Sequence, residues 1–234
     1  MLIKKFFGVM LLLAMIALPQ NVFAEKTDWM DKSFDFRRIR TVIVFDATFN
    51  SGMDYGGSIA LRNLQDIYKD NAEKRLKQRY MTEAQARREL GYQLNMDLES
   101  LNFSNPLEAR RIIMQNAYRI ADAWVVANTD AWDDSSYVVP ERTVWEQKQE
   151  RRTYYDRYGD RHEETYYIQV PVTYPPHRVY VSSLQMTFQV FEARRGEMIF
   201  ARKDVRDRED YQAQNGMFGR MCNSFFEDFA KKLR

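Results

Sequence analysis

The stretch from Tyr180 to Val205 constrains the fold of this chain more than any other. Along its first half, every second residue is apolar, and these residues are Leu184, Met186, Phe188 and Val190. A period of two is typical of a strand with one buried face and one wet face. Gly196 lies in a turn over 193–197, and Met198–Ala201 supplies a return strand. The pattern predicts a β-hairpin, against which a following helix packs.

The first 24 residues have the pattern of an export signal. Two lysines precede an apolar run from Phe6 to Leu18, and Val22 and Ala24 place small residues three before and one before a cut. The run is shorter than the roughly 20 residues that span a bilayer. We expect cleavage after Ala24, with an uncleaved anchor as the alternative. The mature chain would then be periplasmic or secreted, without a transmembrane segment.

The mature chain is predicted to be close to neutral. Removing the signal removes two lysines, which leaves 33 basic and 33 acidic residues. Such a balance provides no global field that would attract nucleic acid or an anionic membrane. We therefore expect no nucleic-acid partner.

After a flexible leader over residues 25–33, we predict a single α+β domain over residues 34–234. Val42–Phe45 is a continuous, β-branched apolar run, which is typical of a central strand covered on both faces. Trp124–Asn128 is the second predicted strand. Three predicted helices separate these strands, so we expect the strands to be parallel.

These three helices are predicted from apolar stripes at helical spacing. The first covers residues 59–80, and the second begins at a capping box, Thr82–Gln85. Gly91 lies inside the second stripe and disfavours a helix there. The third helix begins after Asn105, with Pro106 in its first turn.

The last predicted helix begins near Asn215, after a charged link over 206–211. Its apolar stripe repeats every four residues, as Met217, Met221, Phe225, Phe229 and Leu233. Cys222 lies on this stripe, so a buried, inert thiol is favoured over a reactive one. As the single cysteine, it can form no internal disulfide.

The most unusual segment is a predicted β-ribbon inserted at about 141–175. Eight of the chain's 14 tyrosines lie in it or beside it. A two-residue turn at Gly159-Asp160 would place Tyr158 opposite Arg161, Tyr154 opposite Thr165, and Arg152 opposite Tyr167. The same register would set Asp156 against Glu163, a like-charge pair that a slip or a longer loop would relieve. Pro171 indicates an edge strand.

The ribbon could bind nucleic acid through interleaved arginines and tyrosines. However, residues 141–164 carry six basic and seven acidic side chains, a balance that does not attract phosphate. Tyrosine and arginine are common anchors of protein–protein contacts, and an edge ribbon can add strands to a partner. The alternative is a ribbon that folds back on its own domain.

The order of elements resembles that of small exported bacterial envelope domains, many of them of unknown function. The segments that carry the resemblance are Phe34–Val44, Ala121–Val126 and the hairpin around Phe191–Phe200. The resemblance implies a fold like that of the curli-secretion lipoprotein and the penicillin-binding-protein activator lipoprotein. It implies no catalytic residue. This chain lacks the lipid-attachment cysteine of those lipoproteins, and its ribbon is unusually long and aromatic.

The sequence contains no complete catalytic motif. The only histidines, His162 and His177, lie in or beside the predicted ribbon and are interpreted as surface residues. Asp46 ends the first buried strand, where α/β enzymes often place a carboxylate. In phosphotransferases of the haloacid-dehalogenase type an Asp-x-Asp pair occupies this place, but here the second member is Thr48. Capping of the loop is the favoured role for Asp46.

We predict no metal and no cofactor. Asp130, Asp133 and Asp134 could bind calcium, but they lack the ligand spacing of an EF-hand and are interpreted as a solvated loop. The glycine-rich loop over 50–58 lacks the lysine of a P-loop and is interpreted as a connection. Two histidines and one cysteine, scattered along the chain, are unsuited to zinc.

Together these observations predict an α+β domain with a mixed β-sheet covered by helices and a projecting tyrosine-rich β-hairpin. We expect a non-enzymatic, exported cell-envelope protein that binds another envelope protein, or a second copy of itself, through the aromatic ribbon. The candidate binding residues are Tyr154, Tyr155, Tyr158, Tyr166, Tyr167 and Arg152. The alternative function is that of a phosphatase-like hydrolase centred on Asp46.

Overall fold

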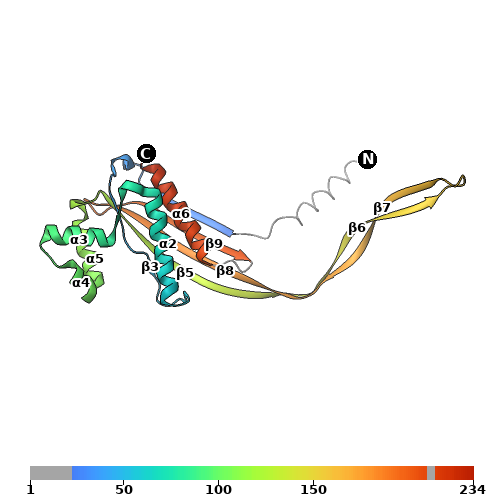
Figure 1. The fold of residues 1–234 in the computed structure, drawn as a ribbon, viewed down its shortest axis with the longest axis horizontal. Helices are drawn as coiled ribbons and strands as arrows, with labels where there is room; N and C mark the ends of the chain where they lie inside the picture. Colours follow the sequence, from blue (N-terminus) through green and yellow to red (C-terminus); the bar gives the residue numbers. More distant parts are fainter. Residues whose placement is uncertain (1–22, 210–213) are drawn as a thin grey trace. The chain divides into compact units, whose positions relative to one another are not determined.

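The computed structural model of the chain describes residues 23–209 and 214–234. The described chain divides into two compact units (Figure 1). The first unit contains the described residues up to Asp134 and from Val181 onward, and the second unit is Ser135–Tyr180. The predicted signal peptide lies outside the described residues, apart from its last two residues.

A mixed β-sheet forms the centre of the first unit. Its strands are β1 (Phe23–Met30), β2 (Val42–Val44), β3 (Thr48–Phe49), β4 (Tyr80–Thr82), β5 (Ala123–Val139), β8 (His177–Glu192) and β9 (Met198–Glu209). They run in the order β1-β9-β8-β5-β2-β4, and β3 pairs with β5. β2 is parallel to β4 and β5, whereas β9 is antiparallel to β1 and β8. The predicted hairpin and the predicted parallel pair are both confirmed.

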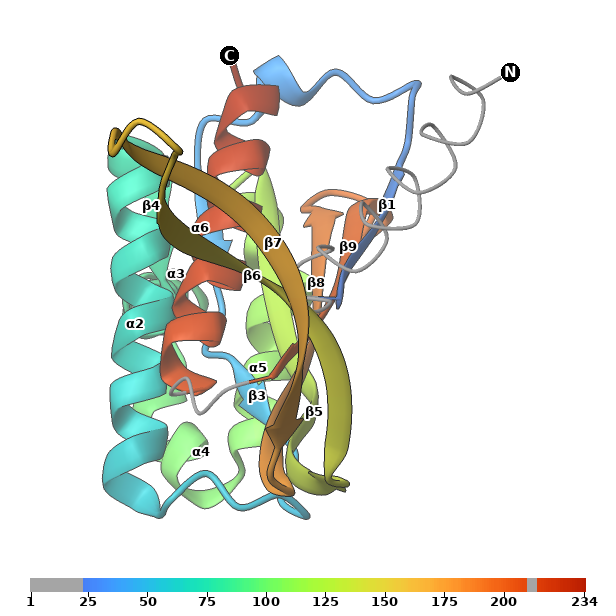
Figure 2. The ribbon, with the colours of Figure 1, turned by 90° about the vertical axis from the view of Figure 1, so that its right-hand side faces the viewer.

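Helices cover both faces of this sheet. They are α2 (Ser58–Leu76), α3 (Glu83–Leu94), α4 (Leu98–Ser104), α5 (Pro106–Asn116) and α6 (Gln214–Lys232), with short 3-10 turns η1 (Phe36–Arg38), η2 (Lys77–Arg79) and η3 (Ala117–Arg119). α2 and α6 lie side by side on one face (Figure 2). α3, α4 and α5 contribute to a separate core on the other face. The α+β class predicted from the sequence is confirmed.

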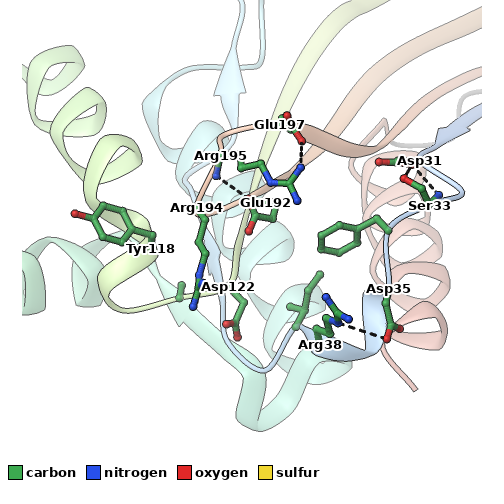
Figure 3. A pocket seen from close by; sticks show the side chains of 13 residues that line it. Asp31, Ser33, Asp35, Arg38, Tyr118, Asp122, Glu192, Arg194, Arg195 and Glu197 are labelled. Carbon is green, nitrogen blue, oxygen red and sulfur yellow. Dashed lines mark hydrogen bonds and ion pairs between the residues drawn. The ribbon is translucent and has the colours of Figure 1, made fainter.

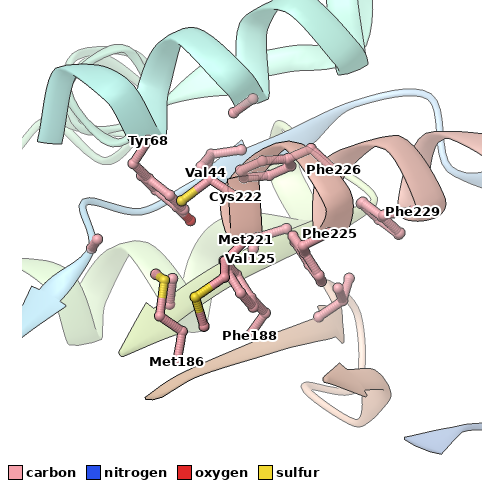
Figure 4. Close-up of a cluster of buried hydrophobic side chains, with 14 of the residues drawn as sticks. Val44, Tyr68, Val125, Met186, Phe188, Met221, Cys222, Phe225, Phe226 and Phe229 are labelled. Atoms are coloured by element: carbon pink, nitrogen blue, oxygen red, sulfur yellow. The ribbon is translucent and has the colours of Figure 1, made fainter. Parts of the chain in front are cut away.

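The larger core lies between the sheet and the α2–α6 layer (Figure 4). The apolar stripe of α6 is buried there, as its spacing predicts, and so is Cys222. The rings of Phe188 and Phe225 stack with centroids 4.3 Å apart. Phe225 also stacks on Phe200, so one α6 side chain joins β8 to β9. Burial raises the pKa of the Cys222 thiol well above its ordinary value.

β2 is covered on both faces, as its unbroken apolar run predicts. Val42 and Val44 point into the α2–α6 core, whereas Ile43 and Phe45 point into the core with α3 and α5. Every residue of the run therefore lies in one of the two cores, and a polar residue at any of these positions would be buried among apolar side chains.

Two segments predicted to be irregular are strands instead. The predicted leader over 25–33 is wrong, because residues up to Met30 pair with β9 as an edge strand. The charged link predicted from Arg206 is also wrong at its start, because β9 continues to Glu209. In β1 both faces are exposed, so its sequence lacks the alternation that would reveal a strand.

The helical region also differs from its prediction in two places. The first helix ends at Leu76, and Tyr80–Thr82 forms strand β4 beside β2. The second stripe breaks at Asn95, which adopts a left-handed conformation with φ 50°, and α4 begins only at Leu98. The predicted capping box at Thr82 and Gln85 is confirmed, as is the Asn105 cap of α5.

Within the described ranges, no helix is both long enough and apolar enough to cross a membrane.

Candidate functional site

The second unit contains the ribbon that carries the candidate binding residues. Its strands β6 (Arg142–Tyr155) and β7 (Arg161–Tyr174) pair antiparallel with each other. Tyr155 lies opposite Arg161, so a five-residue loop over Asp156–Asp160 connects the strands. The predicted two-residue turn is therefore wrong. Proline at position 171 fits its strand because β7 pairs only with β6 in this two-stranded sheet.

The longer loop changes which residues face each other. Tyr154 lies opposite His162 rather than Thr165, and Arg152 lies opposite Glu164 rather than Tyr167. The physical reason is the like-charge pair that the shorter turn would create. With the longer loop, Asp156 leaves the ladder, and Glu163 faces an uncharged threonine.

The carboxylate of Asp156 organises the loop. Its Oδ1 accepts hydrogen bonds from the backbone N–H groups of Tyr158 (2.8 Å) and Asp160 (3.0 Å). Its Oδ2 lies 3.1 Å from Nε2 of His162. The hydrogen bond with His162, together with those from the backbone, lowers the pKa of Asp156. Gly159 adopts φ 87°, a conformation that favours glycine, so the loop sequence suits its shape.

The candidate residues do not share one face of the ribbon. Residues paired across an antiparallel ladder point to the same side, and neighbours along a strand point to opposite sides. Tyr154, Tyr166 and Arg152 are therefore on one face, and Tyr155 and Tyr167 are on the other. The two faces present separate sets of aromatic side chains.

All of the candidate side chains are exposed. The most accessible are Tyr158 at 74%, Tyr155 at 68% and Tyr167 at 61%. Tyr154 stacks on the His162 ring with centroids 5.3 Å apart. The guanidinium of Arg157 lies 4.7 Å from the centroid of the Tyr158 ring. These contacts order the rings near the loop without burying them.

The ribbon unit has no core of its own. None of the residues from Ser135 to Tyr180 is buried. The first unit differs in this respect, because two clusters of buried side chains hold its sheet and helices together. An isolated two-stranded ribbon is marginally stable in water, because it lacks a second layer to cover its side chains.

Trp145 was missed as a candidate by the sequence reasoning. It lies in β6, opposite Pro171, and is 67% exposed. The segment was identified from its number of tyrosines, and a single tryptophan does not contribute to that number. Alternation along residues 143–149 could have found it, because the odd-numbered positions there carry no charge.

Asp46 lies in the first unit, directly after β2, and its carboxylate forms an ion pair with Lys69 at 2.8 Å. The backbone N–H of Asp46 donates to Glu83 Oε2 at 2.8 Å, and the Asp46 carbonyl accepts from Arg110 at 2.8 Å. Glu83 and Arg110 are themselves paired at 2.7 Å. The chain around Asp46 is thus fixed by α3 and α5.

The three aspartates weighed as calcium ligands take part in hydrogen bonds within the first unit. Asp130 accepts from Thr187 and Gln185, and Asp134 accepts from Ser182 at 2.6 Å. The carboxylates of Asp130 and Asp134 thus join β5 to β8, whereas Asp133 accepts a hydrogen bond from Gln214 through its backbone carbonyl. Within residues 23–209 and 214–234, no group of acidic, histidine or cysteine side chains has the arrangement of a metal site.

A recess of about 630 Å3 opens in the first unit (Figure 3). Three arginines and five carboxylates line it. Asp122 Oδ2 accepts hydrogen bonds from the backbone N–H groups of Arg40 (2.8 Å) and Thr41 (3.0 Å). Arg195 lies 3.3 Å from Glu197 in the β8–β9 turn. The Asp122 carboxylate thus fixes the backbone at Arg40 and Thr41 beside the recess.

No family model matches the chain, and no curated protein matches it. Among solved structures, a PelC dodecamer from Paraburkholderia phytofirmans has a TM-score of 0.44 and 6% identity, with 89% of this chain and 98% of that chain covered. A PDZ domain protein from Parabacteroides distasonis has a TM-score of 0.33 and 9% identity, with 92% of this chain and 38% of that chain covered. At TM-scores this low, neither likeness assigns a family or a function.

Proposed function

We propose that this protein is a non-enzymatic, exported envelope protein that binds another protein through its ribbon. The domain of the first unit would serve as the stable base, in line with the envelope domains that its sequence resembles. The ribbon would supply the contact surface through Tyr154, Tyr155, Tyr158, Tyr166 and Tyr167, with Arg152 beside them.

The observation that carries this proposal is the absence of any buried residue in the unit Ser135–Tyr180, combined with its exposed aromatic rings. Burial of aromatic side chains is a dominant contribution to the stability of cores and interfaces. The first unit already has two cores of its own. A partner protein is the natural source of the layer that the ribbon lacks.

The ordered loop supports the same proposal. Asp156 holds the backbone at Tyr158 and Asp160, and the rings of Tyr154 and Tyr158 each contact a neighbouring side chain. A contact surface that is ordered before binding loses less conformational entropy when the complex forms. The loop therefore presents its aromatic rings in a prepared arrangement.

The test is photo-crosslinking from the loop in the native cell. A photoreactive residue replaces Tyr158, and captured proteins are identified by mass spectrometry. One dominant captured protein is expected. If no protein is captured specifically, the proposal is contradicted.

A second test replaces Tyr154, Tyr155, Tyr166 and Tyr167 with serine. Capture of the partner should be lost while the melting temperature stays unchanged, because none of these rings belongs to a core. The matched control replaces the ribbon's Thr143, Thr153, Thr165 and Thr173 with serine, which keeps a hydroxyl at each position. Retained capture by the tyrosine variant would refute the assignment of these rings.

The hydrolase centred on Asp46 stays the alternative proposal, supported by the position of this carboxylate directly after a buried strand. Its test is a panel of phosphatase and esterase substrates, with Asp46→Asn as the variant. An activity that this variant removes would establish the alternative and displace the non-enzymatic role.

A further inference from the structure

Strand β6 of the ribbon has an open edge. Within the described part of the chain it pairs with β7 only, so the backbone N–H and C=O groups along its other edge face no strand. β6 is 14 residues long and contains neither proline nor glycine. A long, continuous edge of this kind is suited to pairing with a further strand.

The open edge of β7 is less suited to such pairing. It carries Pro171, which has no N–H to donate. Prolines in edge strands lie where the missing donor faces away from the neighbouring strand, so the gap falls on the open edge of β7. Proline is also one of the devices that protect an edge from pairing. A strand that joins the ribbon therefore joins β6.

The charged side chains on one face of β6 alternate in sign. Even-numbered positions share a face, and Glu146, Lys148, Glu150 and Arg152 follow one another there. A row of one sign would repel an identical strand in every register. An alternating row repels an identical strand in some registers and attracts it in others. The row can therefore select one register of self-pairing.

We propose that β6 pairs antiparallel with β6 of a second copy of the chain, about a twofold axis at Gln149. The inference rests on the proposed binding role of the ribbon and names its partner. In this register Lys148 lies opposite Glu150 of the other copy, and Glu146 lies opposite Arg152. Twofold symmetry repeats each pair of opposite charges on the other side of the axis.

The neighbouring registers bring like charges together. If the axis moves by one residue, either Lys148 or Glu150 lies opposite the same residue of the other copy. If the axis moves by two residues, either Arg142 lies opposite Arg152, or Arg151 lies opposite itself. Like charges directly opposite each other destabilise a ladder. Among these registers, only the proposed one is free of them.

The same register gives two exposed rings of β6 suitable neighbours. Tyr154 lies opposite Val144 of the other copy, and on the other face Trp145 lies opposite Thr153. Trp145 is 67% exposed and Tyr154 is 44% exposed in the single chain. Aromatic and β-branched residues form favourable cross-strand pairs. The product is a four-stranded sheet, β7-β6-β6-β7, which is more stable than an isolated pair of strands.

Sedimentation equilibrium of the purified protein, with a charge swap, tests the inference. We expect a monomer–dimer equilibrium. Glu146→Arg places arginine opposite Arg152 at both ends of the interface and should raise the dissociation constant about tenfold. Adding Arg152→Glu restores opposite charges and should recover most of the loss. Positions 146 and 152 lie roughly 20 Å apart along one strand, so recovery has to come from contact between copies.

The matched control combines Glu146→Arg with Arg151→Glu. It has the same net charge as the swap, but its new carboxylate lies opposite Gln147 on the other face. This control should leave the dimer as weak as Glu146→Arg alone does. Circular dichroism checks that every variant is folded.

Disulfide formation tests the register. Opposite residues of an antiparallel pair have Cα atoms about 4.5–5.5 Å apart, a separation that a disulfide can bridge. Gln149→Cys, on the axis, should therefore give a linked dimer on mild oxidation. Gln147→Cys is the control, because its two copies would lie roughly 13 Å apart along the strands. Cys222 is buried and contributes no background.

A protein that is monomeric at every concentration overturns the inference. A dimer that the charge swap fails to recover, or that Gln149→Cys fails to link, overturns it as well. The proposed function can fail separately. Capture of a different protein from Tyr158 by a monomeric chain would overturn self-pairing and leave the binding role of the ribbon intact.

Discussion

Arg202 in β9 donates two hydrogen bonds to the carboxylate of Asp28 in β1, each 2.7 Å long. The same guanidinium reaches Asp228 in α6 at 3.1 Å. The Arg202 side chain is only 4% exposed, whereas Asp28 and Asp228 are 40% and 36% exposed. One buried cation therefore joins the edge strand, its neighbour and a helix.

This difference in exposure predicts that removing the two carboxylates and removing the guanidinium lower the free energy of unfolding by different amounts. Replacing both Asp28 and Asp228 with alanine leaves the buried guanidinium of Arg202 without an opposite charge, and should cost about 3 kcal/mol of unfolding free energy. Arg202→Met leaves two carboxylates that water can reach, and should cost less. Urea unfolding measures both values. Equal losses would show that exposure does not govern this site.

Alkaline pH should destabilise the first unit through Tyr80. Burial, with the carboxylates of Glu73 and Asp46 nearby, raises the pKa of the Tyr80 hydroxyl from 10.0 to about 12. The folded state then holds this proton more tightly than the unfolded chain does. The stability that it contributes is present below pH 10 and is lost as the pH rises towards 12.

Urea unfolding at about pH 9 and about pH 11 checks the prediction. Tyr80→Phe should reduce the loss of stability between the two values. Tyr92→Phe, which changes a ring that is 88% exposed, should show the same loss as the unmodified protein. If Tyr80→Phe loses as much stability between these pH values as the unmodified protein does, Tyr80 is not the cause of the alkaline destabilisation.

The loop of the ribbon should depend on one carboxylate. Asp156→Ala removes the acceptor for the backbone N–H groups of Tyr158 and Asp160. Hydrogen exchange at these two amides should then accelerate about tenfold, with no change in the melting temperature, because the loop lies outside both cores. Asp160→Ala is the control, since it also removes one acid from the loop. Similar acceleration in both variants would contradict a special role for Asp156.

Gly91 in α3 should resist replacement by alanine, although alanine is favoured in helices by up to about 1 kcal/mol. A Cβ at this position would lie 3.0 Å from the backbone oxygen of Met96. Because backbone cannot move as a flexible side chain does, Gly91→Ala should cost about 1 kcal/mol net. Gly219→Ala in α6 is the control, since its Cβ would meet only the Ile67 side chain, at 3.4 Å.

Thermal unfolding compares the two glycine variants. A lower melting temperature for the Gly91 variant, with an unchanged or higher one for the Gly219 variant, is the expected result. Stabilisation by both substitutions would show that local packing does not exclude alanine at position 91.

The sequence predicts those elements whose side chains are sorted by burial. Val42–Phe45, the β8–β9 hairpin and the α6 stripe each meet a core, so their apolar spacing identifies them. β1 has two exposed faces, and β4 has three residues between two helices, so neither offers a period to detect. Gly91 interrupts the apolar stripe of α3 because its position lies close to the backbone of Met96. The spacing of apolar residues gives no sign of such a contact.

The candidate site was predictable in composition but not in register. Tyrosine content located the ribbon, whereas the pairing of its strands depends on a loop that Asp156 closes with its own side chain. Glycine followed by aspartate favoured a shorter turn. The repulsion between Asp156 and Glu163 was the signal for the longer loop, and it also determines which aromatic rings share a face.

The absence of buried side chains between Ser135 and Tyr180 has a consequence for how this protein can evolve. Selection removes the substitutions that lower the stability of a protein below the level that function needs, and replacements in a core are prominent among these. A surface residue of the ribbon escapes that filter, since its replacement leaves both cores intact. The ribbon can therefore accumulate changes in step with whatever surface it contacts, while the domain that carries it stays fixed.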